Sequence, residues 1–86
     1  MHHIIWRQSA LNELAELWVD ADAVLRETIT MAVAEIDSSL ARSPNDIGES
    51  RPDDRRIAFE PPLGYIFEVR SLDQQVVISH VWLTRN

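Results

Sequence analysis

The side chains best suited to chemistry in this sequence are Arg residues of its second half. Arg51, Arg55 and Arg56 lie close together in the chain. The planar guanidinium group of Arg binds a phosphate or a carboxylate through two parallel hydrogen bonds, whereas Lys supplies only a point charge. We therefore predict that these residues contact an RNA phosphate or an acidic partner. The simpler interpretation is a solvated loop of mixed charge, because three acidic residues lie in the same segment.

His80 is a candidate acid or base, because imidazole exchanges a proton near neutral pH. Cleavage of RNA through its 2′-hydroxyl group needs such a group together with a cation that stabilises the transition state. Arg70 and Arg85 are the candidates for this cation. The alternative is that His80 only packs beside a neighbouring aromatic residue.

The remaining candidates are weaker. Tyr65 follows a glycine and is able to stack on a base, although a Tyr in such a strand commonly lies in the core with its hydroxyl group at the rim. His2 and His3 have no further ligands at a suitable spacing, so we predict no metal site. With only two Gly residues the chain has no phosphate-binding loop, and we expect no cofactor.

Length and composition bound the class of protein. A chain of 86 residues has room for one domain, residues 1–86, because a chain this short buries only about 60–65% of its unfolded surface. The sequence contains no Cys, which rules out disulfides and thiolate metal sites and agrees with a reducing compartment. It has no signal-like segment and no run near the roughly 20 apolar residues of a membrane span. We expect a cytoplasmic protein that does not enter a membrane.

The net charge of −6 is unfavourable for binding nucleic acid, because such binding draws much of its affinity from neutralised phosphates. All eight basic residues are Arg, against fourteen acidic residues. Residues 1–43 hold three of these Arg and residues 44–86 hold five, with seven acidic residues in each half. A basic patch is therefore expected from the second half.

Two helices are expected in the first half. Apolar residues recur at three- and four-residue steps from Ala10 to Val19, with Ser9 as a candidate N-cap. Asp20-Ala21-Asp22 interrupts this pattern with two candidate N-cap residues, and the apolar stripe that begins after it predicts a helix over about residues 22–42. The Ser43-Pro44 step ends it. These segments predict a helical hairpin.

Short strands are expected around this hairpin. Residues 3–6 are β-branched and aromatic, and residues 55–60, 65–70 and 76–83 alternate between apolar and polar. Residues 47–54 show no period and are predicted to be a loop. In the last strand, strict alternation places Val77, Ser79, Val81 and Leu83 on one face, and Ile78, His80 and Trp82 on the other. The last three strands are expected to form an antiparallel meander that the first strand joins at an edge or beside the last strand.

The order β-α-α-β-β-β resembles the RelE/ParE toxins of bacterial toxin–antitoxin systems, a group that includes plasmid stabilisation proteins. The resemblance extends over essentially the whole chain. It is carried by Ile4-Ile5-Trp6-Arg7-Gln8-Ser9-Ala10-Leu11-Asn12-Glu13-Leu14, by the segment from Ser43-Pro44 to Gly48, by Arg56-Ile57-Ala58-Phe59, and by Ile66-Phe67-Glu68-Val69 with Val76-Val77-Ile78. It implies an α+β fold in which the helical hairpin packs on a small, mainly antiparallel sheet. It also implies a cognate antitoxin whose helix or strand covers the sheet and the hairpin.

The resemblance implies two different targets. RelE-like members are ribosome-dependent mRNA endoribonucleases, and in this chain Arg56, Arg70, His80 and Arg85 are the residues that would serve such a reaction. Their Tyr-Arg step in the penultimate strand is replaced here by Leu63-Gly64-Tyr65. ParE-like members lack that catalytic set and inhibit DNA gyrase by binding it. We therefore expect a ParE-like inhibitor, with the RelE-like ribonuclease and a non-toxic interaction domain as alternatives.

Overall fold

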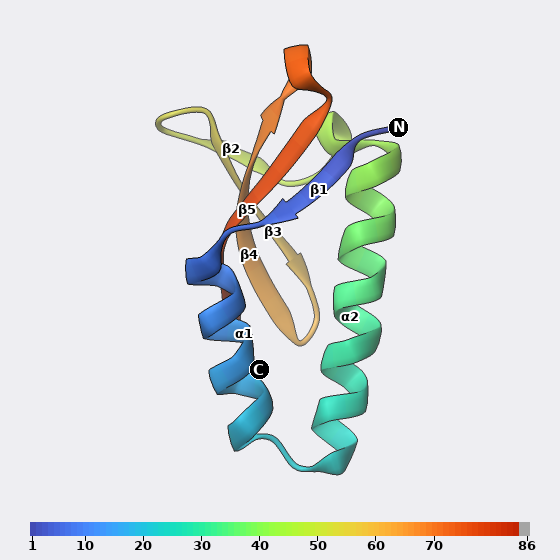
Figure 1. Ribbon diagram of the computed structural model, residues 1–86, viewed down its shortest axis with the longest axis vertical. Helices are drawn as coiled ribbons and strands as arrows, with labels where there is room; N and C mark the ends of the chain where they lie inside the picture. The colour runs from blue at the N-terminus through green and yellow to red at the C-terminus, as the bar shows by residue number, and fades with distance from the viewer. Residues whose placement is uncertain (85–86) are drawn as a thin grey trace.

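The protein is built from one β-sheet and two helices that pack against it (Figure 1). The computed structural model describes residues 1–84 and confirms the predicted α+β fold. In chain order the elements are β1 (His3–Trp6), α1 (Gln8–Asp20), α2 (Ala23–Arg42), the 3-10 turn η1 (Pro44–Asp46), β2 (Glu49–Arg51), β3 (Arg55–Glu60), β4 (Leu63–Arg70), the 3-10 turn η2 (Ser71–Asp73) and β5 (Gln75–Leu83). No helix in this part of the chain is long and apolar enough to span a membrane.

The sheet has the strand order β1-β5-β4-β3-β2. Every neighbouring pair is antiparallel except β1 with β5. β1 thus lies at an edge and beside the last strand, which satisfies both positions that we predicted for it. The antiparallel meander of the last three strands is also confirmed.

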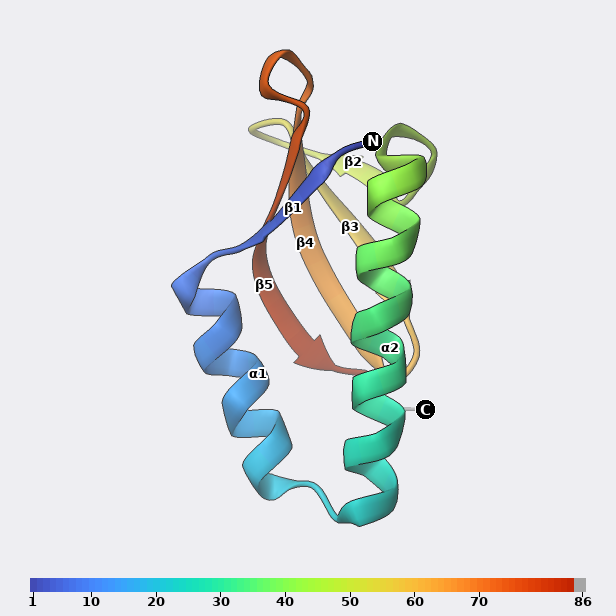
Figure 2. The ribbon, with the colours of Figure 1, turned by 45° about the vertical axis from the view of Figure 1, so that its right-hand side comes forward.

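The two helices begin and end where local chemistry allows. The Asp22 side chain accepts a hydrogen bond from the Leu25 N–H at 2.8 Å and caps α2, as predicted. The predicted capping by Ser9 is wrong, because Ser9 lies inside α1 and Arg7 holds its N-cap position without a side-chain bond. α2 runs along the sheet, whereas α1 lies beside β5 (Figure 2).

α1 protects the edge of β5 where β1 no longer pairs with it. β1 pairs only with the first four residues of β5. Farther along, the Ser9 hydroxyl donates to the Ser79 carbonyl at 2.8 Å, and the Val81 N–H donates to the Glu13 carboxylate at 3.3 Å. These side chains satisfy backbone groups that would otherwise form an unpaired sheet edge.

The sheet has one covered and one open face. Alternation along β4 places Leu63, Tyr65 and Phe67 on the covered face, where they are buried with Ile29 and Ile36 of α2. The opposite face, which we call the open face, carries residues that the cross-strand pairs place side by side. These are Arg55, Ile57 and Phe59 of β3, Gly64, Ile66, Glu68 and Arg70 of β4, and Gln75, Val77, His80 and Trp82 of β5.

A β-bulge at Ser79 changes the faces of β5. Residues 78 and 80 pair with the consecutive residues 67 and 66 of β4, so Ser79 between them has no partner there. Val81 is thereby returned to the covered face of Ile78, where it is buried. The prediction that Val81 shares a face with Val77 and Ser79 is wrong, and so is the prediction that His80 shares a face with Ile78.

Residues 47–54 are not a simple loop, because β2 forms within them and pairs with β3. All three residues of β2 are exposed, so no buried alternation marks this strand in the sequence. Asp53 and Asp54 adopt positive φ angles of 66° and 60° in the connection to β3. Asp tolerates this conformation better than most residues, and the turn lets β2 fold back on β3.

Candidate functional site

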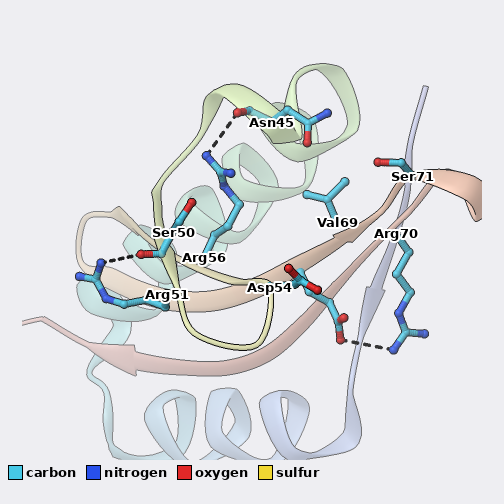
Figure 3. A pocket seen from close by; sticks show the side chains of 9 residues that line it. Asn45, Ser50, Arg51, Asp54, Arg56, Val69, Arg70 and Ser71 are labelled. Carbon is cyan, nitrogen blue, oxygen red and sulfur yellow. Dashed lines mark hydrogen bonds and ion pairs between the residues drawn. The ribbon is translucent and has the colours of Figure 1, made fainter.

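Two depressions meet at Glu68. The larger one, which we call the Arg70 depression, has a volume of about 440 Å³ and is lined by Asn45, Arg51, Asp54, Arg56, Glu68 and Arg70, among others (Figure 3). It lies where β4 continues beyond the start of β3, since the pairing of β3 with β4 begins at Glu68. The turn between β2 and β3 forms its other wall.

The second hollow, which we call the His80 depression, has a volume of about 220 Å³ and is lined by Arg7, Ser9, Arg55, Glu68, Ser79 and His80. Sheet register brings these residues together. Arg55 pairs across the strands with Glu68, and Ile66, two residues before Glu68, pairs with His80. Arg7 comes from the junction between β1 and α1.

Glu68 links the two depressions through ion pairs. Its carboxylate lies 3.5 Å from Arg7 and 3.3 Å from Arg70. All three side chains are between three and five tenths exposed, so each pair contributes at most about 1 kcal/mol to stability. Their effect is mainly to position the guanidinium groups at the two hollows. Arg55 lies in the same cluster and forms no ion pair within 4 Å among residues 1–84.

His80 is oriented by Glu13. The Nδ1 atom of His80 lies 3.2 Å from Glu13 Oε1, and Glu13 also accepts the Val81 N–H. Because an ionised carboxylate only accepts hydrogen bonds, Nδ1 is the donor in this contact, and in a neutral imidazole Nε2 is then the acceptor. The pair is a suitable arrangement for proton transfer at the side of the His80 depression.

Arg56 binds backbone carbonyl groups of the protein itself. Its Nε donates to the Ile47 carbonyl at 2.9 Å, and its Nη2 donates to the carbonyls of Asn45 and Gly48 at 3.3 and 3.4 Å. These contacts hold the segment between α2 and β2 against the sheet. Arg56 lines the Arg70 depression, but its donors are largely committed to the protein's own backbone.

The other predicted site residues are spread over several environments. Tyr65 is 3% exposed and packs against Phe67 on the covered face, which argues against the predicted stacking on a base. Burial, with a smaller contribution from the charge of Glu60, raises the pKa of Tyr65 to about 12. Arg51 is exposed at the edge of the sheet and lies 3.5 Å from Glu49. Arg85 lies outside the described residues.

The depressions concentrate positive charge on an acidic protein. Five of the eight Arg residues line them, against only two of the fourteen acidic residues. Within residues 1–84, no three His, Asp or Glu side chains come together as metal ligands. The site is therefore suited to binding anionic groups through Arg.

Sequence reasoning missed Arg7, Glu13 and Glu68. Arg7 and Glu13 reach the site because β1 and the start of α1 lie alongside β5, whereas Glu68 reaches it because β4 pairs with β3. The available signal was the predicted pairing of the first and last strands, which places the residue after β1 beside the middle of β5.

Comparison with known proteins adds the fold family. No protein-family model matches the sequence, and no curated protein matches it. Among solved structures, a chain in the RelBE2 toxin–antitoxin complex of Mycobacterium tuberculosis is similar, with a TM-score of 0.75, 19% identity and 98% of each chain covered. A chain in the chromosomal ParDE system of P. aeruginosa has a TM-score of 0.69 at 18% identity, covering 99% of this chain and 98% of its own.

A third similar structure is the intact RelBE complex of E. coli, with a TM-score of 0.64, 16% identity and full coverage of both chains. The chain has the RelE/ParE toxin fold. The resemblance predicted from the sequence is thus confirmed at the level of the fold. In this RelE/ParE fold, both depressions lie on or beside the open face of β3, β4 and β5. The start of α1 contributes Ser9 to the His80 depression.

Proposed function

We propose that this chain is the toxin of a type II toxin–antitoxin pair, that a cognate antitoxin neutralises it, and that it acts in the cytoplasm. The structures to which it is similar are toxin–antitoxin complexes of the RelBE and ParDE kinds, matched over nearly the whole of each chain. We further propose that it is a ParE-like inhibitor that acts by binding, with DNA gyrase as the implied target.

The observation that carries binding rather than cleavage is the dispersal of Arg56, Arg70 and His80, the predicted catalytic residues that lie within residues 1–84. Arg56 is occupied by three backbone carbonyls, Arg70 is paired with Glu68, and His80 lines a different depression from both. A reaction needs its acid or base and its cation around one reacting atom. These residues do not provide that convergence.

A second candidate, the RelE-like endoribonuclease, is favoured by a different set of residues. The Glu13–His80 pair lies beside Arg7 and Arg55 in the His80 depression. An imidazole with an acceptor nitrogen next to two guanidinium groups is suited to deprotonating a 2′-hydroxyl group and stabilising a phosphate. In this version the chemistry belongs to Arg7 and Arg55, not to Arg56.

Induction of the chain alone in a bacterial host tests these functions. Protein synthesis and DNA integrity are followed in the same culture. A ParE-like inhibitor produces filamentation and DNA damage while translation continues, and the ribonuclease produces a prompt fall in protein synthesis. Normal growth with abundant folded protein contradicts both and supports a non-toxic interaction domain.

Two variants refine the result. His80→Gln keeps a polar side chain but removes the imidazole ring, so loss of toxicity is expected if His80 transfers a proton. Arg42→Gln is the control, because Arg42 is exposed at the end of α2 and, within residues 1–84, its side chain bonds only to the Ser38 hydroxyl. Toxicity that survives His80→Gln rejects the ribonuclease with His80 as its acid or base.

A further inference from the structure

The open face changes from charged to aromatic along its length. Phe59, Gly64 and Trp82 lie in one row across β3, β4 and β5. The rings of Phe59 and Trp82 meet edge to face at 6.3 Å above the glycine, and Phe59 is 60% exposed. Exposed aromatic pairs of this kind anchor apolar side chains of binding partners.

The aromatic row is continuous with the cationic depressions. Arg55 and Phe59 are four residues apart on the same face of β3, which corresponds to about 13 Å. An extended peptide repeats its side chains on one side every two residues, so a short segment spans both regions. The face therefore matches a ligand with anionic groups at one end and an apolar side chain at the other.

A peptide and a nucleic acid both combine anionic groups with apolar or aromatic groups. The charge distribution of the protein distinguishes between these two classes of ligand. Outside the depressions the chain carries twelve of its fourteen acidic residues, so an extended polyanion is repelled as soon as it leaves the patch. The patch itself contains Glu68 and Asp54, whose carboxylates are able to accept hydrogen bonds from the N–H groups of a peptide, whereas the backbone of a nucleic acid has a phosphate at every residue and no N–H donor. Both features favour a short acidic peptide.

We propose that the open face binds an acidic segment of a partner protein, with its carboxylates at Arg55 and Arg70 and an apolar side chain against Phe59 and Trp82. Naming the antitoxin as this partner rests on the proposed function. The binding chemistry rests only on the residues of the face.

The test measures direct binding by fluorescence anisotropy. The probe is a labelled twelve-residue peptide in which Glu and Asp alternate with Leu and Phe. A second peptide carries Gln and Asn in place of the acids, and a single-stranded oligouridylate of the same length represents nucleic acid. We expect the acidic peptide to bind about ten-fold or more tightly than either of the others, since each charge-assisted contact contributes about one factor of ten.

Three variants locate the binding. Arg55→Gln with Arg70→Gln weakens acidic-peptide binding by about ten-fold or more, and Phe59→Ser weakens it by removing the exposed ring. Arg42→Gln removes the same charge away from the face and leaves affinity within about two-fold. Circular dichroism confirms that each variant is folded, which is expected because these side chains are exposed.

Several results overturn the inference. Equal binding of the acidic and amide peptides shows that charge does not drive binding. If Arg42→Gln weakens binding as much as the double variant does, the peptide does not bind at Arg55 and Arg70. Tighter binding of the oligouridylate, lost in the double variant, makes the face a nucleic-acid surface. Growth arrest without peptide binding refutes this inference and supports the toxin proposal. Peptide binding without growth arrest supports this inference and contradicts the toxin proposal.

Discussion

Replacing Gly64 by Ala tests how the open face is packed. A Cβ atom at this position would lie 2.6 to 2.7 Å from the Cε2, Cζ2 and Nε1 atoms of Trp82. These are the three nearest atoms, and all belong to one side chain. Since real Cβ atoms do not approach other atoms so closely, the indole ring has to move.

The expected change in the free energy of unfolding combines two destabilising contributions and one stabilising contribution. Insertion of a methyl group into a packed site destabilises by about 1–3 kcal/mol. A ring that swings away from it loses its edge-to-face contact with Phe59, which is worth about 0.5–1.5 kcal/mol. Against this, Ala reduces the entropy of the unfolded chain and stabilises by about 0.4–1 kcal/mol. Together these contributions predict that Gly64→Ala destabilises the protein by about 0.5–4 kcal/mol.

A double-mutant cycle isolates the clash. In a Trp82→Ala background the three nearest atoms are removed, so only the unfolded-state effect remains and Gly64→Ala becomes neutral or slightly stabilising. The free energies of unfolding come from urea titrations followed by far-ultraviolet circular dichroism, because Trp fluorescence changes with the substitution. An equal cost of Gly64→Ala in both backgrounds refutes the reasoning.

Gly48→Ala is the contrasting control. Gly48 has a φ angle of +77°, and its Cβ would lie 2.6 Å from the Ile57 carbonyl oxygen, which belongs to the backbone. No side-chain truncation relieves this contact. Gly48→Ala should therefore be as destabilising with Trp82→Ala as without it, and a cost that disappears in that background contradicts the assignment.

Two further predictions concern Arg56 and Tyr65. Arg56→Gln should destabilise by about 1–3 kcal/mol, because backbone carbonyls lose their donors, whereas Arg55→Gln should change stability by no more than about 0.5 kcal/mol, and urea titration of both variants distinguishes them. The pKa of Tyr65 is about 12 in the folded protein against 10.0 in the unfolded chain. The unfolded chain therefore loses this proton first, so stability falls as pH rises from 10 toward 12, and Tyr65→Phe should reduce the slope. An unchanged slope in Tyr65→Phe contradicts the raised pKa.

The sequence alone determined the elements whose signals are local. The three- and four-residue apolar steps predicted both helices, Asp22 marked the start of α2, and alternation located β3 within residues 55–60. The order of these elements, together with the residues that carry the resemblance, predicted the RelE/ParE fold. Each of these signals lies within one segment and depends on that segment's own dihedral angles and exposed side.

Tertiary structure decided the features that depend on a partner segment. The bulge at Ser79 exists only in the register of β5 with β4, and β2 exists only because β3 pairs with it. Likewise, Arg55 and Arg56 look alike in the sequence, yet the Arg56 guanidinium binds loop carbonyls and Arg55 lines the His80 depression. The local sequence indicates that a side chain is polar. The group that it contacts depends on residues from other segments, which come close to it only when the sheet forms.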